Sequence, residues 1–299
     1  MVADLIRSRP YLAVILLIAL VWGVALAWMS WAGLHIAGLA DFGMTLLLFV
    51  ANLLVYRRLS LGDRAASMLS GFTVFFALTT GSVVVSYLVA TIDRPFADPL
   101  LSRADSALGF DWVAWWHFVQ THPALRNFLA AAYVSMVVQV VICLVAFPLA
   151  GMTDRNREML ACFAVALVPT LVLFAFFPAA SAWVYYKVEP GKMPMFLVAL
   201  EALRNGTLPV INVQRLDGLI TFPSYHTAAA IMLVYVARGT RYLFLSAVVN
   251  GLMLVSTLSE GGHYLVDLIG GGGVALGSIL LVRTAMRRNL QARTSLTTS

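Results

Sequence analysis

The stretch HYLVDLIGGGGVALGSILLV, residues 263–282, decides the fold. Its twenty residues are apolar or small, and apart from the leading histidine the only charged side chain is Asp267. Twenty such residues form a helix about 30 Å long, which matches the hydrocarbon thickness of a bilayer. A carboxylate inside such a span is costly and is functional by default. The stretch therefore predicts a transmembrane helix with a functional group near its start.

Seven more apolar stretches predict a polytopic membrane protein. Of the 299 residues 61% are hydrophobic and only 11% are charged, against about 25% charged in soluble domains. This composition excludes a soluble enzyme, a disordered chain and a disulfide scaffold, and the two cysteines, both in apolar stretches, are interpreted as small hydrophobes. The predicted fold is all-α, a bundle of about eight transmembrane helices. The other seven stretches are Tyr11–Trp31, Phe42–Tyr56, Met68–Ala90, Phe128–Phe147, Met159–Trp183, Ser224–Ala237 and Tyr242–Thr257.

The chain divides into three parts of one integrated membrane domain. Residues 1–158 hold the N-terminal helices together with an aromatic and acidic segment, 91–127, which is expected to form a helix in the membrane interface. Residues 159–285 form the predicted catalytic helix core, and 286–299 are a polar cytoplasmic tail. A second long segment, 184–222, is rich in proline, glycine and cations.

The charge bias predicts the orientation. With the N-terminus inside, the inside segments hold thirteen of the twenty Lys and Arg residues, and the outside segments hold seven. Both termini are therefore expected in the cytoplasm of a bacterial cell, with the protein in the inner membrane. An alternative for the first span is a cleaved signal peptide ending at Ala25-Leu26-Ala27, but the apolar run continues to Trp31, which favours an uncleaved helix.

Two histidines are expected on one membrane face. His226 ends the sequence Phe222-Pro223-Ser224-Tyr225-His226, in which Pro223 and Ser224 are typical of a helix start. His263 lies 37 residues later, with two crossings and the inside turn Arg238–Arg241 between them, so both histidines return to the outside face. Asp267 follows His263 by one helical turn and is placed to orient its imidazole.

These residues favour phosphoryl transfer. Each histidine is predicted at a helix N-terminus, where free N–H groups and the helix dipole attract a phosphate. A histidine nucleophile, an orienting carboxylate and several cations suit that reaction. The set is too sparse for a closed metal site, so no metal and no cofactor are predicted. The candidate phosphate-binding residues, four of them from the segment before His226, are Arg215, Arg204, Ser224, Lys187 and Lys192.

The motifs around both histidines resemble the second and third signatures of the type 2 phosphatidic acid phosphatase superfamily. The resemblance covers about residues 160–285, and the branch it is most similar to is that of inositol phosphorylceramide synthase and its bacterial relatives. The sequence departs from the phosphatase pattern at Tyr225, where glycine is usual, and at Thr257, where an arginine is usual. The first motif, K-x6-R-P, has no match at its expected place.

The resemblance implies a mechanism and a substrate class. His263 would be the nucleophile, Asp267 would orient it, and His226 would be the general acid. The substrate would be a membrane lipid phosphate or phospholipid, and the phosphoryl or headgroup acceptor would be water or a lipid alcohol. The 14 residues Ser224–Ala237 make about 21 Å of helix, so His226 is expected below the outer surface, where a lipid headgroup arrives from the bilayer. The alternative is a non-catalytic lipid-binding or transport protein on the same scaffold; no nucleic-acid partner is predicted, and the oligomeric state stays open.

Overall fold

The computed structural model describes most of the chain. The described residues are 9–38, 43–44, 47, 51, 62–92, 94–188, 195–207, 210–212 and 218–297.

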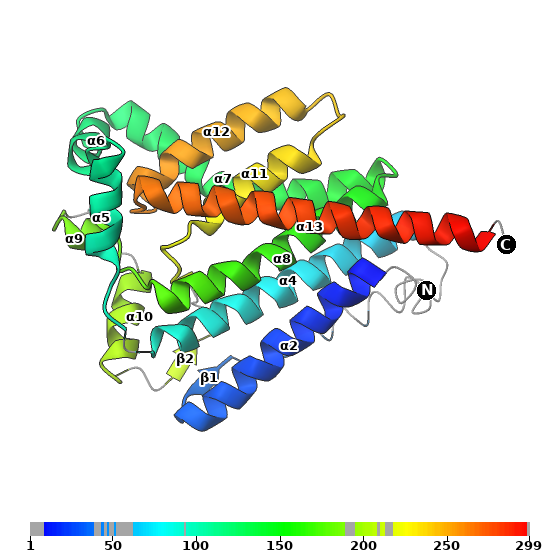
Figure 1. Ribbon diagram of the computed structural model, residues 1–299, viewed down its shortest axis with the longest axis horizontal. Helices are drawn as coiled ribbons and strands as arrows, with labels where there is room; N and C mark the ends of the chain where they lie inside the picture. The colour runs from blue at the N-terminus through cyan, green and yellow to red at the C-terminus, as the bar shows by residue number, and fades with distance from the viewer. Residues whose placement is uncertain are drawn as a thin grey trace.

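Six long apolar helices form the bundle, and each is long enough to cross a membrane. The shorter helix α11, Tyr225–Val236, packs among them, and four short helices follow the spans at one end: α5 (Asp98–Ala107), α6 (Trp112–Gln120), α9 (Ala182–Tyr185) and α10 (Met195–Arg204) (Figure 1). The long helices are α2 (Arg9–Ala32), α4 (Asp63–Ala90), α7 (Pro123–Leu149), α8 (Thr153–Phe176), α12 (Leu243–Glu260) and α13 (Leu265–Thr297).

The helical bundle is confirmed, whereas the count of eight spans is not. Six predicted spans coincide with the six long helices, and the stretch Ser224–Ala237 forms only the 12-residue α11. The stretch Phe42–Tyr56 lies almost wholly outside the described residues. The span predicted for Met159–Trp183 stops early, since α8 ends at Phe176. Pro178 explains this end, because the residue before a proline is driven out of the helical conformation.

Two three-residue strands depart from the all-α prediction. β1 (His35–Ala37) follows α2, and β2 (Val210–Asn212) belongs to the long segment before α11. They pair in parallel, with His35 opposite Val210 and Ala37 opposite Asn212. The short pair ties the end of α2 to the 184–222 segment.

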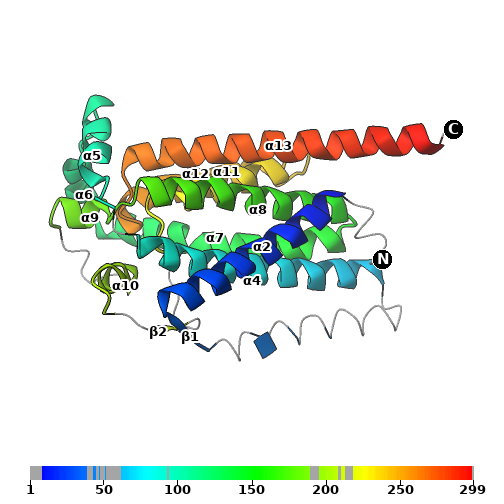
Figure 2. The ribbon, with the colours of Figure 1, turned by 60° about the horizontal axis from the view of Figure 1, so that its bottom comes forward.

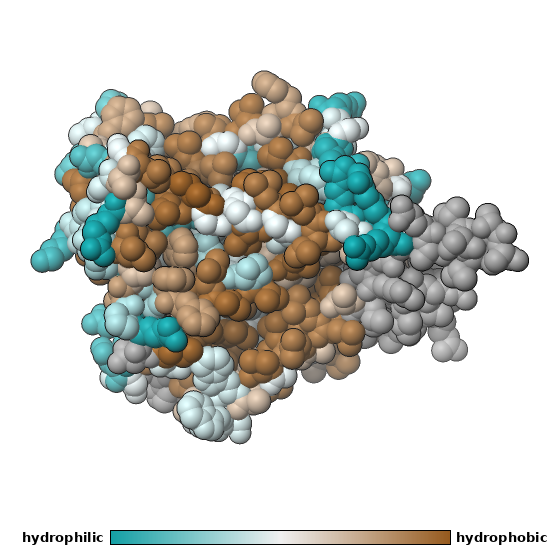
Figure 3. All heavy atoms as spheres, in the orientation of Figure 1, coloured by the Kyte–Doolittle hydropathy of each residue, from teal (hydrophilic) through white to brown (hydrophobic). Residues whose placement is uncertain are grey.

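The elements of the candidate site gather at one end of the bundle. The short helices α5, α6, α9 and α10 lie at the end where α12 meets α13, and α5 runs across the long helices (Figures 1 and 2). The start of α2 and the end of α13 lie at the opposite end. Figure 3 shows an apolar middle on this face with hydrophilic residues toward its two ends, the pattern of a bundle that crosses hydrocarbon.

Helix α8 forms the centre of the bundle. Met159, Cys162, Ala164 and Ala166 are completely buried and pack with apolar side chains of α4, α7, α11 and α13. Both cysteines are free, and Cys162 lies in this core, as expected of a small hydrophobic side chain. The core therefore surrounds α8 with the two helices that carry the candidate histidines.

Helices α11 and α13 approach closely at glycines. A Cβ atom on Gly271 would lie 2.2 Å from the carbonyl oxygen of Ser224 and 2.9 Å from Cβ of Thr227. A Cβ atom on Gly270 would lie 3.1 Å from the rings of Phe222 and Pro223. The sequence-based expectation of close packing is thus confirmed for these two glycines. Gly273 and Gly277 of the same run have nothing within 4 Å of such an atom.

We expect Gly271→Ala to destabilise the protein by about 1–3 kcal/mol, because its methyl group meets rigid backbone and overpacks the α11–α13 contact. Gly273→Ala is the matched control, and it should be neutral or stabilising by up to about 1 kcal/mol, because alanine favours the helix and its methyl group enters open space. Thermal unfolding of the purified proteins measures both changes. Equal stability of the two variants would contradict this account of the contact.

Candidate active site

His263 lies in the tight connection between α12 and α13. Gly262 just before it has φ +60, a left-handed conformation that favours glycine. A Cβ atom on Gly262 would lie 2.7 Å from the Trp183 ring, and one on Gly261 would lie 2.7 Å from Cδ2 of His263. The two glycines therefore allow the imidazole to sit in a closely packed loop, where only 4% of His263 is exposed.

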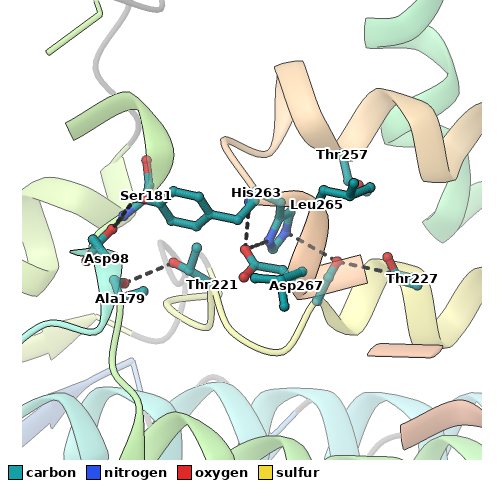
Figure 4. Close-up of polar contacts among 12 residues, drawn as sticks. Asp98, Ala179, Ser181, Thr221, Thr227, Thr257, His263, Leu265 and Asp267 are labelled. Atoms are coloured by element: carbon teal, nitrogen blue, oxygen red, sulfur yellow. Dashed lines mark hydrogen bonds and ion pairs between the residues drawn. The ribbon is translucent and has the colours of Figure 1, made fainter. Parts of the chain in front are cut away.

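The imidazole of His263 is held from both sides (Figure 4). Its Nδ1 lies 3.2 Å from Oδ2 of Asp267, and its Nε2 lies 3.4 Å from Oγ of Ser224. The same Asp267 oxygen accepts a hydrogen bond of 2.9 Å from the backbone N–H of Tyr264. Because Asp267 is bound to Nδ1, that nitrogen carries the proton and Nε2 has the free lone pair. The structure thus brings the predicted pair together and identifies Nε2 as the reactive atom.

Burial keeps the His263 ring uncharged. Desolvation lowers the pKa of His263 to about 4, and a hydrogen bond with the backbone of Thr221 opposes that shift. At pH 7 the imidazole is therefore neutral. A neutral imidazole is the form that acts as a nucleophile.

Ser224 and His226 stand at the start of α11, beside His263. Ser224 is the N-cap residue that the sequence predicts: its Oγ accepts a hydrogen bond of 3.3 Å from the N–H of Thr227. Its own N–H donates to the backbone oxygen of Asp267 at 3.0 Å, which joins the start of α11 to α13. Ser224 is completely buried.

Tyr133 of α7 connects the two histidines. Its ring stacks on the ring of His226, with centroids 4.4 Å apart and planes 19° apart. The other side of the site lies close as well, because a Cβ atom on Gly261 would be 3.1 Å from the Tyr133 ring and 2.7 Å from the His263 ring. His226 and His263 are near enough to interact electrostatically. Sequence reasoning missed Tyr133, since a single aromatic residue in an apolar helix gives no functional signal.

Asp105 of α5 caps the start of α13. Its two carboxylate oxygens accept hydrogen bonds of 2.9 Å from the N–H groups of Leu265 and Val266. Asp105 is completely buried, and burial raises the pKa of its carboxyl while the two hydrogen bonds lower it. The expectation that phosphate meets free N–H groups at the start of α13 is therefore wrong for these two amides, because a carboxylate of the protein already binds them.

Two further side chains hold the same loop. Asp98, at the start of α5, accepts hydrogen bonds from Tyr264 Oη at 2.9 Å, Ser181 N at 3.0 Å and Ala180 N at 2.8 Å. Trp112 of α6 donates from its indole N–H to the carbonyl oxygen of His263 at 2.9 Å. The interfacial segment thus holds the backbone on each side of His263. The spacing of Asp98 and Asp105, seven residues and so one helix face, is the signal that could have identified them.

The predicted phosphate cations lie in different surroundings. Arg204 contacts the backbone oxygen of Arg94, stacks 3.9 Å from the Phe96 ring centroid, and lines an apolar cavity of about 430 Å³ beside α10. Lys187 follows α9 and is exposed. No contact between described residues joins Arg204 or Lys187 to either histidine. Arg215 and Lys192 lie outside the described residues, and Ser224 is the one member of the predicted set that the described contacts bring to His263.

The described residues also bear on metal binding. Within them, no group of three or more His, Cys, Asp and Glu side chains is placed to hold a metal ion. The arrangement that is present is a neutral imidazole with one carboxylate behind it, a second imidazole near it, and a buried serine hydroxyl at its reactive nitrogen.

Comparison with known proteins agrees with this geometry. The family description PAP2 superfamily matches residues 99–281, which include α5, both histidines and Asp267. A search of curated proteins found no match, and a search of solved structures found none either. The match begins at α5, the helix whose carboxylates hold the His263 loop. Since it covers more than half of the 299 residues, the chain belongs to the PAP2 superfamily.

Proposed function

We propose that the protein is an integral-membrane enzyme that cleaves a lipid phosphate or phospholipid through a phosphohistidine. The observation that supports this most directly is the His263 imidazole, which is neutral, bound to Asp267 through Nδ1, and directed by Nε2 toward Ser224. Superfamily membership and the membrane-like bundle support the same class of reaction. Phosphatases and phosphotransferases of lipids are what this superfamily comprises in general.

The proposed reaction has two steps. In the first, the lone pair of His263 Nε2 attacks phosphorus, the P–O bond to the leaving group breaks, and His226 donates its proton to the departing oxygen. In the second, water or a lipid alcohol gives a proton back to His226 while its oxygen attacks phosphorus, and the Nε2–P bond breaks. Asp267 stabilises the positive charge that His263 acquires in the first step. Asp105, Asp98 and Trp112 hold the backbone that carries the imidazole.

The depth of the site supports a lipid as substrate. Helix α11 has 12 residues and is about 18 Å long, against about 30 Å of hydrocarbon. Its far end is fixed, because Arg238 binds both carboxylate oxygens of Glu158 at 2.6 Å and Tyr235 Oη donates to Glu158 at 2.7 Å. With that end at the inner surface, His226 lies below the outer surface. A headgroup that enters sideways from the bilayer reaches such a site directly.

Two outcomes follow from the same intermediate. Attack by water releases phosphate, and attack by a lipid alcohol transfers the phospho-headgroup, as the likeness to inositol phosphorylceramide synthase implies. We propose Arg215, Arg204, Lys187 and Lys192 as cations for the substrate phosphate, because their segment leads into the start of α11. A screen of lipid substrates that records free phosphate and transfer products together separates hydrolysis from transfer. No turnover of any lipid phosphate would favour the non-catalytic alternative.

We also propose that the site faces the periplasm and that both chain ends lie in the cytoplasm. The start of α2 and the end of α13 share one end of the bundle, opposite His263 (Figure 1). A single cysteine at Arg241, in the turn after α11, should react with a membrane-impermeant maleimide only after permeabilisation, whereas one at Ala124 should react in intact cells. The two native cysteines are first replaced by alanine. The reverse labelling pattern would contradict the orientation.

The covalent step predicts an order among three variants. His263→Ala should abolish turnover, because no other group takes the phosphoryl. His226→Ala should cost about 10²–10⁴-fold for a lipid substrate but much less for an activated aryl phosphate, whose leaving group departs without a proton. Asp267→Asn should fold and lose a large part of the activity, since orientation of the imidazole weakens. Steady-state kinetics with both substrates test this order. Equal losses for His226→Ala on the two substrates would reject the general-acid role, and activity in His263→Ala would reject the mechanism.

The pH dependence follows from the lowered pKa of His263. With a pKa of about 4 instead of the ordinary 6.5, the imidazole stays neutral down to about pH 5 and becomes protonated only below that. We therefore expect kcat/KM to stay level between pH 7 and pH 5 and to fall below pH 5, because protonation removes the nucleophile. The measurement is the acid limb of the profile with an aryl phosphate. An acid limb centred at pH 6.5 or above would show an ordinary histidine instead.

A further inference from the structure

The inward face of α7 ends in an arginine at the mouth of the site. Leu129 and Val140 on this helix are 1% exposed and Leu144 is completely buried, and Tyr133 lies on the same stripe by its helical spacing. Arg126 precedes Leu129 by three residues and Tyr133 by seven, so it continues the stripe by one turn toward the end of the bundle. Arg126 itself is exposed. The helix that stacks Tyr133 on His226 therefore directs a cation to the entrance above it.

The neighbouring helix brings the same cation to the His263 loop. Helices α7 and α12 pack along each other, and Asn250 of α12 donates to Gln139 of α7 at 2.8 Å. From that contact toward the site, α7 runs 13 residues to Arg126 and α12 runs 10 residues to Glu260, about 20 Å and 15 Å. Arg126 therefore lies at the level of the loop that follows Glu260. The Arg126 guanidinium and the Glu260 carboxylate interact electrostatically.

The position of Arg126 in its helix is unfavourable without an anion. Helix α7 begins at Pro123, which puts Arg126 in the first turn. A cation there faces the positive end of the helix dipole, at a cost of about 0.3–1 kcal/mol. An anion bound between the guanidinium and the helix start would remove that cost. Such locally unfavourable residues are expected at functional sites.

We propose that Arg126 binds the phosphate group of the substrate at the entrance to the site. The inference rests on the proposed function and adds to it a recognition residue outside the 184–222 segment. Guanidinium binds phosphate through two parallel N–H···O bonds, which suits a group that must capture and orient an incoming headgroup. Glu260 holds Arg126 near the loop when no substrate is bound. Because the side chains of a helix lean toward its N-terminus, Arg126 serves capture more than the bond-breaking step.

Direct binding of inorganic phosphate to the purified protein, measured by calorimetry, tests this without requiring turnover. Arg126→Ala should weaken phosphate binding about tenfold or more, and Arg126→Lys should restore part of it, since the charge returns without the paired geometry. In kinetics with an aryl phosphate, Arg126→Ala should raise KM more than it lowers kcat. Arg103→Ala is the matched control, an exposed arginine of α5 whose Nε binds the Pro99 carbonyl, and it should change binding less than twofold.

Two other roles for Arg126 give different results. If it only neutralises Glu260, the loss in Arg126→Ala should disappear in the Glu260→Gln background; persistence of the loss supports phosphate binding. If it acts only as general surface charge, Arg103→Ala should show an equal loss. Unchanged phosphate binding in Arg126→Ala, with unfolding temperature as the check on folding, overturns the proposal even if His263→Ala is inactive. Phosphate binding that depends on Arg126 in a protein with no turnover would instead reject the proposed function alone.

Discussion

The geometry of the site depends on one buried carboxylate at the start of a helix. Asp105 binds the N–H groups of Leu265 and Val266, and so joins α5 to α13 across 160 residues of sequence. A charged group that is completely buried is stable only when its oxygens are paired, and here two backbone donors pair them. The position of α13 relative to the interfacial segment is therefore fixed by strong, short-range bonds. His263 lies two residues before the first of those donors.

The second constraint is the contact between α11 and α13. Gly271 lets the backbone of Ser224 approach α13, and the N–H of Ser224 binds the Asp267 carbonyl oxygen. This contact sets the distance between the Ser224 hydroxyl and the His263 Nε2. At the other end of α11, Glu158 and Arg238 prevent the short helix from sliding along its axis. Two backbone contacts and one buried ion pair thus determine where the second histidine stands.

Local patterns in the sequence predicted the parts of the site that depend on neighbours in the chain. Spacing by one turn predicted the contact of His263 with Asp267, and residue type predicted the Ser224 cap. The early end of α8 also had a local signal, Pro178, which the length of the apolar run obscured. By contrast, Asp98, Asp105 and Tyr133 act on residues more than 80 positions away, and no local pattern carries such pairings. The roles of the long-segment cations stay predictions, because Arg215 and Lys192 lie outside the described residues.

The bonds between α5 and α13 also impose an order on biosynthesis. Chains are made from the N-terminus, so the α5–α6 segment is complete long before α13 emerges. Until then, Asp105 has no helix start to bind, Asp98 lacks the Tyr264 hydroxyl, and the Trp112 indole lacks the His263 carbonyl. The imidazole becomes oriented only when the last span is inserted beside segments made earlier. A nascent chain is thus chemically silent in the membrane until its final helix arrives, and a product truncated before α13 has no reactive histidine to expose.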